Sequence, residues 1–184
     1  MNSGQPTLLI DLGCGPGTAA LAFADHYGAA FHYHGFDRSS AMRSTAHALL
    51  QQARHFGLIN NASEITVTSG TFDPMTVQNT SPTPVNIIFV ASYLFASKSL
   101  DAVSLARSLR TIIPLTHVQS AAFLYLNSRT KFANRTYEQF IHELGPIERL
   151  RAEEQVIHYR RYAGRTAGRA RFVNDCLILK DPVS

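Results

Sequence analysis

Three glycines at alternate positions follow a short apolar run near the amino terminus. The run covers Leu8–Leu12, with the acid Asp11 inside it, and the glycines are Gly13, Gly15 and Gly17. Glycine adopts positive φ angles easily and has no Cβ, so a small ligand can lie directly against the main chain of such a loop. Since a helical pattern follows, the segment predicts a strand, a nucleotide-binding loop and a helix.

The spacing of the glycines separates two classes of nucleotide ligand. The dinucleotide fingerprint G-x-G-x-x-G requires glycine at position 18, where this chain has Thr18, and this disfavours NAD and FAD. The sequence DLGCGPG at positions 11–17 instead resembles motif I of the class I S-adenosylmethionine-dependent methyltransferases, whose fold is Rossmann-like. The resemblance implies S-adenosylmethionine as cofactor, with Asp11 ordering its amino-acid end. The loop residues assigned to the cofactor are Gly13, Cys14, Gly15 and Gly17.

A second acid stands where the next strand is expected to end. The segment 31–37 has strand character and closes with Asp37, followed by Arg38. In the family that DLGCGPG resembles, a carboxylate here accepts both ribose hydroxyls, because an acceptor-only group binds two adjacent donors. We therefore assign Asp37 and Arg38 to cofactor binding. The alternative is that Asp37 caps the helix that follows.

The resemblance also assigns the adenine and acceptor positions. Adenine is expected after the third strand, where Thr71 replaces the usual acid and the candidates are Thr71, Phe72 and Asp73. After the fourth strand, Ala91 is assigned to the cofactor, and Ser92 and Tyr93 are the catalytic candidates that face the acceptor. The alternative for Tyr93 is a place in the core.

Acid–base groups are not required for this chemistry. Much of the acceleration of methyl transfer comes from holding the acceptor in line with the methyl carbon in a water-poor site. The Asn/Asp-Pro-Pro-Tyr/Phe motif and a Pro-Cys nucleophile are absent, which disfavours methylation of base amino groups and of cytosine carbon. His158 is a candidate base, and Asn127 is either an acceptor-site residue or a loop cap.

No metal site is expected. His32 and His34 share one face of a strand, but we expect no cysteine or carboxylate in register beside them. The two cysteines, Cys14 and Cys176, provide neither a disulfide framework nor a metal set, which fits a reducing compartment.

The order of strand-like and helix-like runs predicts one α/β domain over residues 1–184. Strands are expected at 8–12, 31–37, 65–68, 85–91 and 121–126, and helices at 18–26, 40–56, 100–113 and 134–144. Strands at 155–162 and 171–179 should pair antiparallel, because the connection between them at 163–169 is too short for a crossover helix. The predicted architecture is a three-layer sandwich around a mostly parallel seven-stranded sheet that ends in an antiparallel hairpin.

The first strand begins close to residue 1, whereas the family usually has a helix or longer cap before motif I. We expect this domain to lack that cap, and another subunit or an amino-terminal segment to cover the site.

Positive charge is concentrated near the end of the chain. Seven arginines and two glutamates give +5 between positions 149 and 171, and the remaining ten basic and eleven acidic residues give −1. The hairpin arginines are Arg160, Arg161, Arg165, Arg169 and Arg171. We expect them to contact RNA or another anionic partner, or else to guard an exposed strand edge or bind an acidic protein.

Two hypotheses for function follow. The first is a cytoplasmic S-adenosylmethionine-dependent methyltransferase whose acceptor is RNA or an anionic small molecule. The second is an inactive scaffold or partner subunit with the same fold, and titration with S-adenosylhomocysteine distinguishes the two. No apolar run approaches the ~18 residues that span a bilayer, so no membrane partner is expected.

Overall fold

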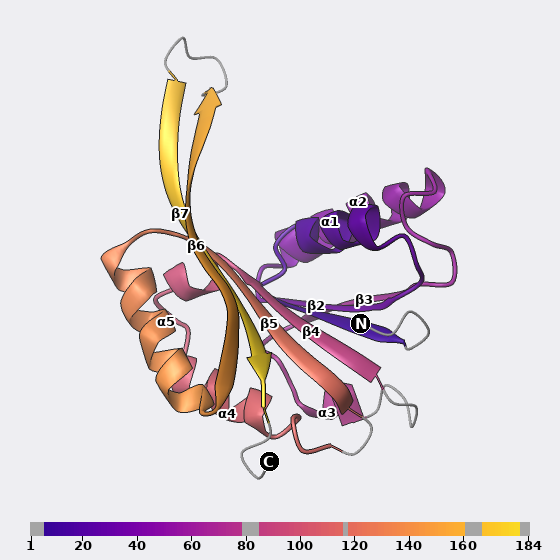
Figure 1. The fold of residues 1–184 in the computed structure, drawn as a ribbon. Helices are drawn as coiled ribbons and strands as arrows, with labels where there is room; N and C mark the ends of the chain where they lie inside the picture. Colours follow the sequence, from indigo (N-terminus) through magenta and orange to yellow (C-terminus); the bar gives the residue numbers. More distant parts are fainter. Residues whose placement is uncertain (1–5, 79–84, 116–117, 161–166, 181–184) are drawn as a thin grey trace.

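A single seven-stranded sheet organises the chain (Figure 1). The computed structural model describes residues 6–78, 85–115, 118–160 and 167–180, of which 76, 78, 85, 157–160 and 167–170 are described as backbone only. The strands are β1 (Thr7–Leu12), β2 (His32–Asp37), β3 (Glu64–Ser69), β4 (Val85–Ser92), β5 (Val118–Ser128), β6 (Ile147–Arg160) and β7 (Ala167–Leu179). Their order is β3-β2-β1-β4-β5-β7-β6, and β1 to β5 are parallel, whereas β7 is antiparallel to both neighbours.

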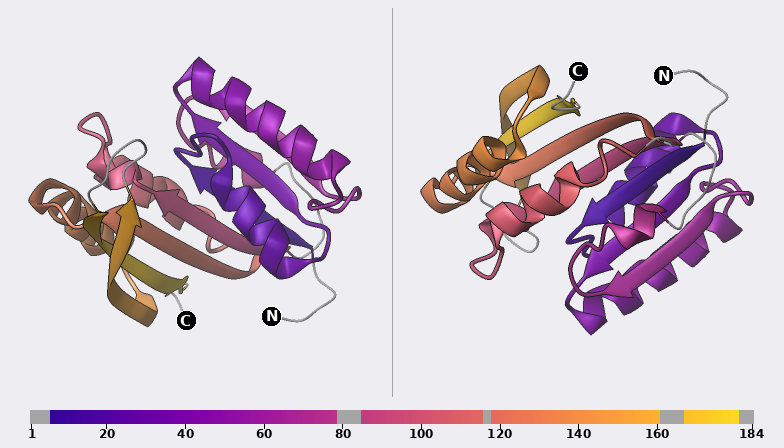
Figure 2. Two further views of the ribbon diagram at one scale, coloured as in Figure 1. Left: turned by 90° about the horizontal axis from the view of Figure 1, so that it is seen from above. Right: turned by 90° about the horizontal axis from the view of Figure 1, so that it is seen from below.

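Helices cover both faces of this sheet. On one face lie α1 (Thr18–Tyr27) and α2 (Ser40–His55), and on the other lie α3 (Met75–Gln78), the 3-10 turn η1 (Leu94–Ala96), α4 (Ala102–Arg110) and α5 (Lys131–Leu144) (Figure 2). Every residue of β1 is buried, because a strand at the centre of such a sheet is covered on both sides. Its alternate side chains enter the two cores: Leu8 and Ile10 pack with α4 and α5, and Leu9 packs with α1 and α2.

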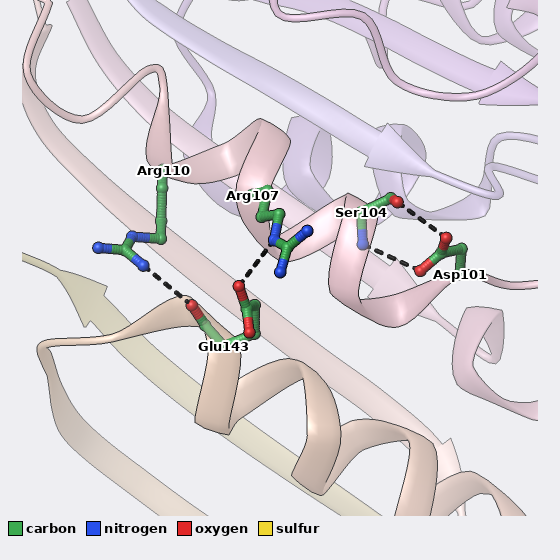
Figure 3. A network of polar contacts seen from close by, with 5 residues as sticks. All are labelled: Asp101, Ser104, Arg107, Arg110 and Glu143. Atoms are coloured by element: carbon green, nitrogen blue, oxygen red, sulfur yellow. Dashed lines mark hydrogen bonds and ion pairs between the residues drawn. The ribbon is translucent and has the colours of Figure 1, made fainter.

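Polar contacts on the surface tie α4 to α5. Arg107 Nε donates to Glu143 Oε1 at 2.8 Å, and Arg110 donates to the main-chain oxygen of Glu143 (Figure 3). At the start of α4, the carboxylate of Asp101 accepts from the N–H and the hydroxyl of Ser104. These contacts fix the helix that forms one wall of the cavity described below.

The predicted three-layer sandwich is confirmed, including the closing antiparallel pair. Five boundaries were wrong by three residues or more, and one of them is the start of β5 at Val118 instead of 121. Helix α4 ends at Arg110 instead of 113, and α5 begins at Lys131 instead of 134, because the Thr130 side chain accepts from the N–H of Ala133 and so caps it earlier. Strands β6 and β7 begin at Ile147 and Ala167, ahead of 155 and 171. Residues 80–84 and most of the predicted 163–169 connection lie outside the described residues.

The sequence did not predict residues 147–154 of β6, because this strand lies at the edge of the sheet. Its residues 148–154 are mainly charged, so they lack the alternation of apolar and polar side chains that marks a half-buried strand. A register shift between Arg149 and Arg151 also breaks the period and leaves Leu150 exposed.

The β6–β7 hairpin extends beyond the rest of the sheet. The last pairing of β7 with β5 joins Phe172 to Ser128, whereas its pairing with β6 continues to Ala167 opposite Arg160. Ser128 ends a parallel strand, so the hairpin projects past the edge at which the parallel strands end, which we call the carboxyl edge. Figure 1 shows it as a two-stranded arm.

One sheet face is only partly covered. On the side of α1 and α2, these helices lie over β1 to β3, and no helix of the described residues lies over β5 and β7 (Figures 1 and 2). Leu126, Cys176 and Ile178 point to that side and are half-buried. No helix within the described part of the chain is long and apolar enough to cross a membrane.

Candidate functional site

The three glycines form the predicted loop at the carboxyl end of β1. Gly13, Gly15 and Gly17 all have positive φ, at 72°, 53° and 80°. The main-chain N–H of Gly13 and that of Cys14 both donate to the oxygen of Phe36 on β2, which holds the loop against the neighbouring strand. A Cβ at Gly13 would lie 3.1 Å from Leu94, and one at Gly15 would meet nothing within 4 Å. The loop is therefore packed on its inner side and open at Gly15.

Asp37 lies against this loop, as the sequence predicted. Its Oδ2 accepts from the N–H of Gly15 at 2.9 Å, and its Oδ1 accepts from the N–H of Ser39 at 2.8 Å. The helix that follows is capped by Ser39, whose hydroxyl accepts from Met42, so Asp37 is not its N-cap. The carboxylate retains free lone pairs for two adjacent donors of a ligand.

Asp11 is buried on the other side of the loop. It is 1 % exposed, its Oδ2 accepts from the hydroxyl of Tyr33 at 3.0 Å, and its Oδ1 has no partner among the described residues. Burial raises the pKa of the Asp11 carboxyl to about 6, against the lowering effect of the Tyr33 hydrogen bond. A buried carboxylate oxygen without a donor is a fitting partner for a ligand ammonium group.

The Cys14 side chain turns away from the loop opening into the core. Burial raises the pKa of its thiol to about 12, so the thiol stays protonated and unreactive. Gly35 of β2 leaves space for the side chains of Tyr33 and Cys14, because a Cβ at position 35 would lie 2.7 Å from the Tyr33 hydroxyl and 3.0 Å from the Cys14 sulfur. Sequence reasoning missed Gly35, since a glycine inside a strand pattern does not by itself indicate what fills the space.

A cavity of about 290 Å³ opens beside the loop, between the ends of β1, β2 and β3 and the start of α4. Its volume is near the lower end of the ~300–1,000 Å³ typical of ligand pockets. The apolar lining consists of Leu12, Phe36, Phe72, Leu94, Leu100 and Leu105. The polar lining includes Asp37, Arg38, Thr71, Ser97, Ser99, Asp101, Ser104 and Ser108. An apolar slot with polar groups at its rim suits a nucleoside.

The structure brings some of the predicted cofactor residues to this cavity. Gly13, Asp37, Arg38, Thr71 and Phe72 line it. Arg38 also donates to the hydroxyl of Ser99, which links β2 to the segment before α4. Sequence reasoning missed the contribution of η1 and α4, because scattered serines on a helix carry no motif.

Other predicted residues lie elsewhere. Asp73 lies outside the cavity lining, and its Oδ1 accepts from the N–H of Met75 at the start of α3. Ala91 is fully buried in the core beneath α4 and α5. Asn127 is buried, and its Oδ1 accepts from the N–H of Ser128, which is the loop-capping alternative. The side chain of His158 lies outside the described residues.

Ser92 and Tyr93 lie at the carboxyl end of β4. Ser92 is half-buried, whereas Tyr93 is 50 % exposed, which rules out the core alternative for its side chain. Tyr93 has φ 62°, and it is the one non-glycine residue with positive φ in the described part of the chain. Its N–H donates to the oxygen of Leu126, and its ring meets Phe172 edge to face at 6.0 Å.

Two expectations about charged neighbours need correction. Glu64 of β3 stands in register with His32, and its Oε2 lies 3.0 Å from Nδ1, so a carboxylate does lie beside this histidine. In addition, several arginines near the chain end form ion pairs that the sequence did not indicate, because the long twisted hairpin brings acids beside them. Those pairs are Arg149–Asp175, Arg151–Glu153 and Arg171–Glu154.

Comparisons with known proteins support this geometry. Residues 9–87 match the family model of a methyltransferase domain, whereas no curated protein matches the sequence. A candidate RNA methyltransferase from Pyrococcus horikoshii is similar in structure, with 13 % identity, a TM-score of 0.60 and coverage of 96 % of this chain and 76 % of that one.

Two further solved structures share the fold. An S-adenosylmethionine-dependent methyltransferase from Aquifex aeolicus has 15 % identity and a TM-score of 0.55, and 96 % of this chain and 85 % of that one are covered. A candidate methyltransferase from Streptococcus mutans, solved with S-adenosylhomocysteine, has 11 % identity, a TM-score of 0.50 and coverage of 94 % and 89 %. Residues 9–87 thus match a methyltransferase domain, and the glycine loop and the sheet order give the chain the Rossmann-like fold of the S-adenosylmethionine-dependent methyltransferases that it resembles.

Proposed function

We propose that this protein transfers the methyl group of S-adenosylmethionine to an anionic acceptor held at the carboxyl edge beside Ser92 and Tyr93. The observation that carries the proposal is the 2.9 Å hydrogen bond from the Gly15 N–H to Asp37. It joins two predicted cofactor positions, of which Asp37 also lines a cavity of nucleoside size. When bound, S-adenosylmethionine supplies an electrophilic methyl carbon on its sulfonium.

The residues present fit this cofactor. The free lone pairs of Asp37 suit the two ribose hydroxyls, and the apolar cavity lined by Phe36, Phe72 and Leu105 suits the adenine ring. The unpartnered Oδ1 of Asp11 suits the ammonium group of the methionine part, with the open main chain at Gly15 beside it. Cys14 and Gly17 contribute main chain to the loop. Asp73 and Ala91 do not contact the cofactor in this proposal, and they stabilise the start of α3 and the core.

Positioning supplies the catalysis in this proposal. Tyr93 and Leu94 are consecutive, and Leu94 packs over Gly13 while Tyr93 faces out at the carboxyl edge. The turn between them therefore separates the cofactor loop from the acceptor position. Ser92 and Tyr93 orient the acceptor atom toward the methyl carbon and exclude water.

A partner completes the site. The half-buried apolar side chains Leu126, Cys176 and Ile178 lie on the part of the sheet face that no described helix covers, and the main chain of Leu126 adjoins Tyr93. We expect a second subunit or an amino-terminal segment to cover this face of the single domain.

RNA is the acceptor class that we favour. The arm projects past the carboxyl edge, and the sequence that runs from the end of β6 into β7 contains Arg160, Arg161, Arg165 and Arg169. Arginine pairs with phosphate through its planar fork.

Transfer of labelled methyl groups tests the proposal. The protein is incubated with methyl-labelled S-adenosylmethionine and unmodified transcribed RNA, with a small-molecule extract as the second arm. We expect ribonuclease-sensitive label in the RNA, and its loss in Asp37→Ala. Label in small molecules alone contradicts RNA as acceptor, and a failure to bind S-adenosylhomocysteine favours the inactive scaffold.

A further inference from the structure

We propose that Tyr93 and Phe172 form a stacking platform for one unpaired base of a single-stranded nucleic acid. The inference rests on the proposed function, because it names the acceptor class of the same site. It starts from the backbone of Tyr93, which has a φ of 62°. For a residue with a large side chain, this conformation has a cost in free energy. Strain of this kind persists where the surroundings enforce it, and it concentrates at ligand sites.

The surroundings of Tyr93 do enforce this conformation. Its N–H donates to the oxygen of Leu126 at 2.8 Å, and its own oxygen accepts from the N–H of Ala96. Buried Phe95 anchors the next turn in an aromatic cluster with Tyr125 and Tyr137. The backbone is therefore held from both sides, while the Tyr93 ring itself stays 50 % exposed.

The second ring comes from the base of the arm. Phe172 lies opposite Ser128, at the last register pair before β7 leaves β5. Its ring meets Tyr93 at 87°, so the edge contact fixes the Tyr93 ring without covering both of its faces. An aromatic face open at the carboxyl edge is a sequence-tolerant surface for a nucleobase.

Positive charge lies across the arm from these rings, because Arg171 and Phe172 are consecutive in β7 and their side chains point to opposite faces. Arg171 precedes Phe172, and its main-chain oxygen accepts from the N–H of Arg129. Both guanidinium groups reach Glu154, at 3.5 Å and 2.8 Å, so two cations share one carboxylate and one positive charge remains. In this proposal a base stacks on the rings and a neighbouring phosphate pairs with the arginines across the base of the arm, the two contacts by which proteins bind single strands.

The geometry favours an unpaired base over a duplex. A base inside a duplex has both faces stacked on its neighbours, so it offers Tyr93 no face unless it is flipped out. Methyl transfer to a base likewise requires that the base leave the stack and reach the turn at Tyr93 and Leu94, which adjoins Gly13.

The experiment measures stacking and charge separately. Full-length protein saturated with S-adenosylhomocysteine is titrated with a short single-stranded RNA that contains 2-aminopurine, and with the same sequence as DNA and as a duplex. We expect the fluorescence to be quenched on binding to the single strands, and the duplex to bind more weakly. Tyr93→Ala should weaken single-strand binding roughly tenfold and abolish quenching, whereas Tyr93→Phe, which keeps the ring, should retain both.

A salt series separates the rings from the arginines. Arg129→Ala and Arg171→Ala should each lower the slope of log affinity against log salt by about 0.7, whereas Tyr93→Ala should leave that slope unchanged. Phe172→Leu is a second ring variant, and S-adenosylhomocysteine affinity and thermal unfolding check that each variant folds. Three results would overturn the proposed stacking platform. They are equal binding of duplex and single strand, equal binding of an acidic peptide, and unchanged quenching in Tyr93→Ala. A parent protein that does not bind S-adenosylhomocysteine contradicts the proposed function instead.

Discussion

The hydroxyl of Tyr33 on β2 donates a 3.0 Å hydrogen bond to Oδ2 of Asp11, the acid that precedes the glycine loop on β1. Both side chains are buried on the face covered by α1 and α2. The bond joins the first two strands beside the loop, and it leaves one oxygen of Asp11 without a partner among the described residues. We expect both the stability of the fold and ligand binding to depend on this pair.

Asp11 should make the stability of the ligand-free protein fall as pH rises. Its pKa is about 6 in the folded chain and 3.8 ordinarily, so the folded chain holds this proton more tightly. The stabilisation is therefore complete below about pH 4 and is lost as pH rises through about 6. Since one pKa unit is worth about 1.4 kcal/mol, the change approaches ~3 kcal/mol.

Urea unfolding of the parent and of Asp11→Asn between about pH 4 and pH 7 measures this effect. The asparagine keeps an acceptor for Tyr33 but does not titrate. The free energy of unfolding of the variant should therefore not decline between about pH 4 and pH 7 as that of the parent does. Parallel pH curves for the two proteins would show that Asp11 titrates normally.

Gly35→Ala should destabilise the protein by about 1–3 kcal/mol, because the new Cβ would lie 2.7 Å from the Tyr33 hydroxyl. Removing that hydroxyl with Tyr33→Phe relieves the closest contact. The cost of Gly35→Ala should therefore be smaller in the Tyr33→Phe background, as a double-mutant cycle by urea unfolding measures. Additive costs would contradict the steric account.

Tyr137→Phe should destabilise the protein by about 1–3 kcal/mol. The Tyr137 hydroxyl donates to buried Asp175 at 2.9 Å, and the variant removes this donor while keeping the ring stacked on Tyr125. Tyr125→Phe is the matched control, because the Tyr125 hydroxyl makes no hydrogen bond within the described chain, although Asn127 lies near it. Thermal unfolding of both variants checks the prediction, and equal losses would contradict it.

The fold and half of the site could be predicted because their signals are local. The glycine loop, Asp37 and the parallel strands each have a short sequence pattern, and the structure has them where the pattern put them. The cavity wall from Leu94 to Ser108 could not be predicted, because it depends on how α4 packs against distant strands. The pairing of Arg129 and Arg171 with Glu154 likewise arises from the twist of a hairpin and not from spacing along the chain.

The outer arginines of the arm should contribute to RNA binding through charge alone. Arg160→Ala combined with Arg161→Ala should weaken binding at low salt, and it should reduce the slope of log affinity against log salt by about 0.7 for each phosphate that the variant no longer neutralises. Filter binding across a salt series measures this slope. Identical slopes for the parent and the double variant would leave the arm as an edge guard or a surface for protein binding.

Calorimetric titration with S-adenosylhomocysteine tests the central claim most directly. The account predicts that the parent binds one molecule per chain and that Asp37→Ala weakens binding at least tenfold, because the variant removes the acceptor for two ribose hydroxyls. Asp25→Ala, which removes an exposed carboxylate on α1, should bind as the parent does. Absence of binding by the folded parent, or equal affinity of Asp37→Ala and the parent, would contradict the account.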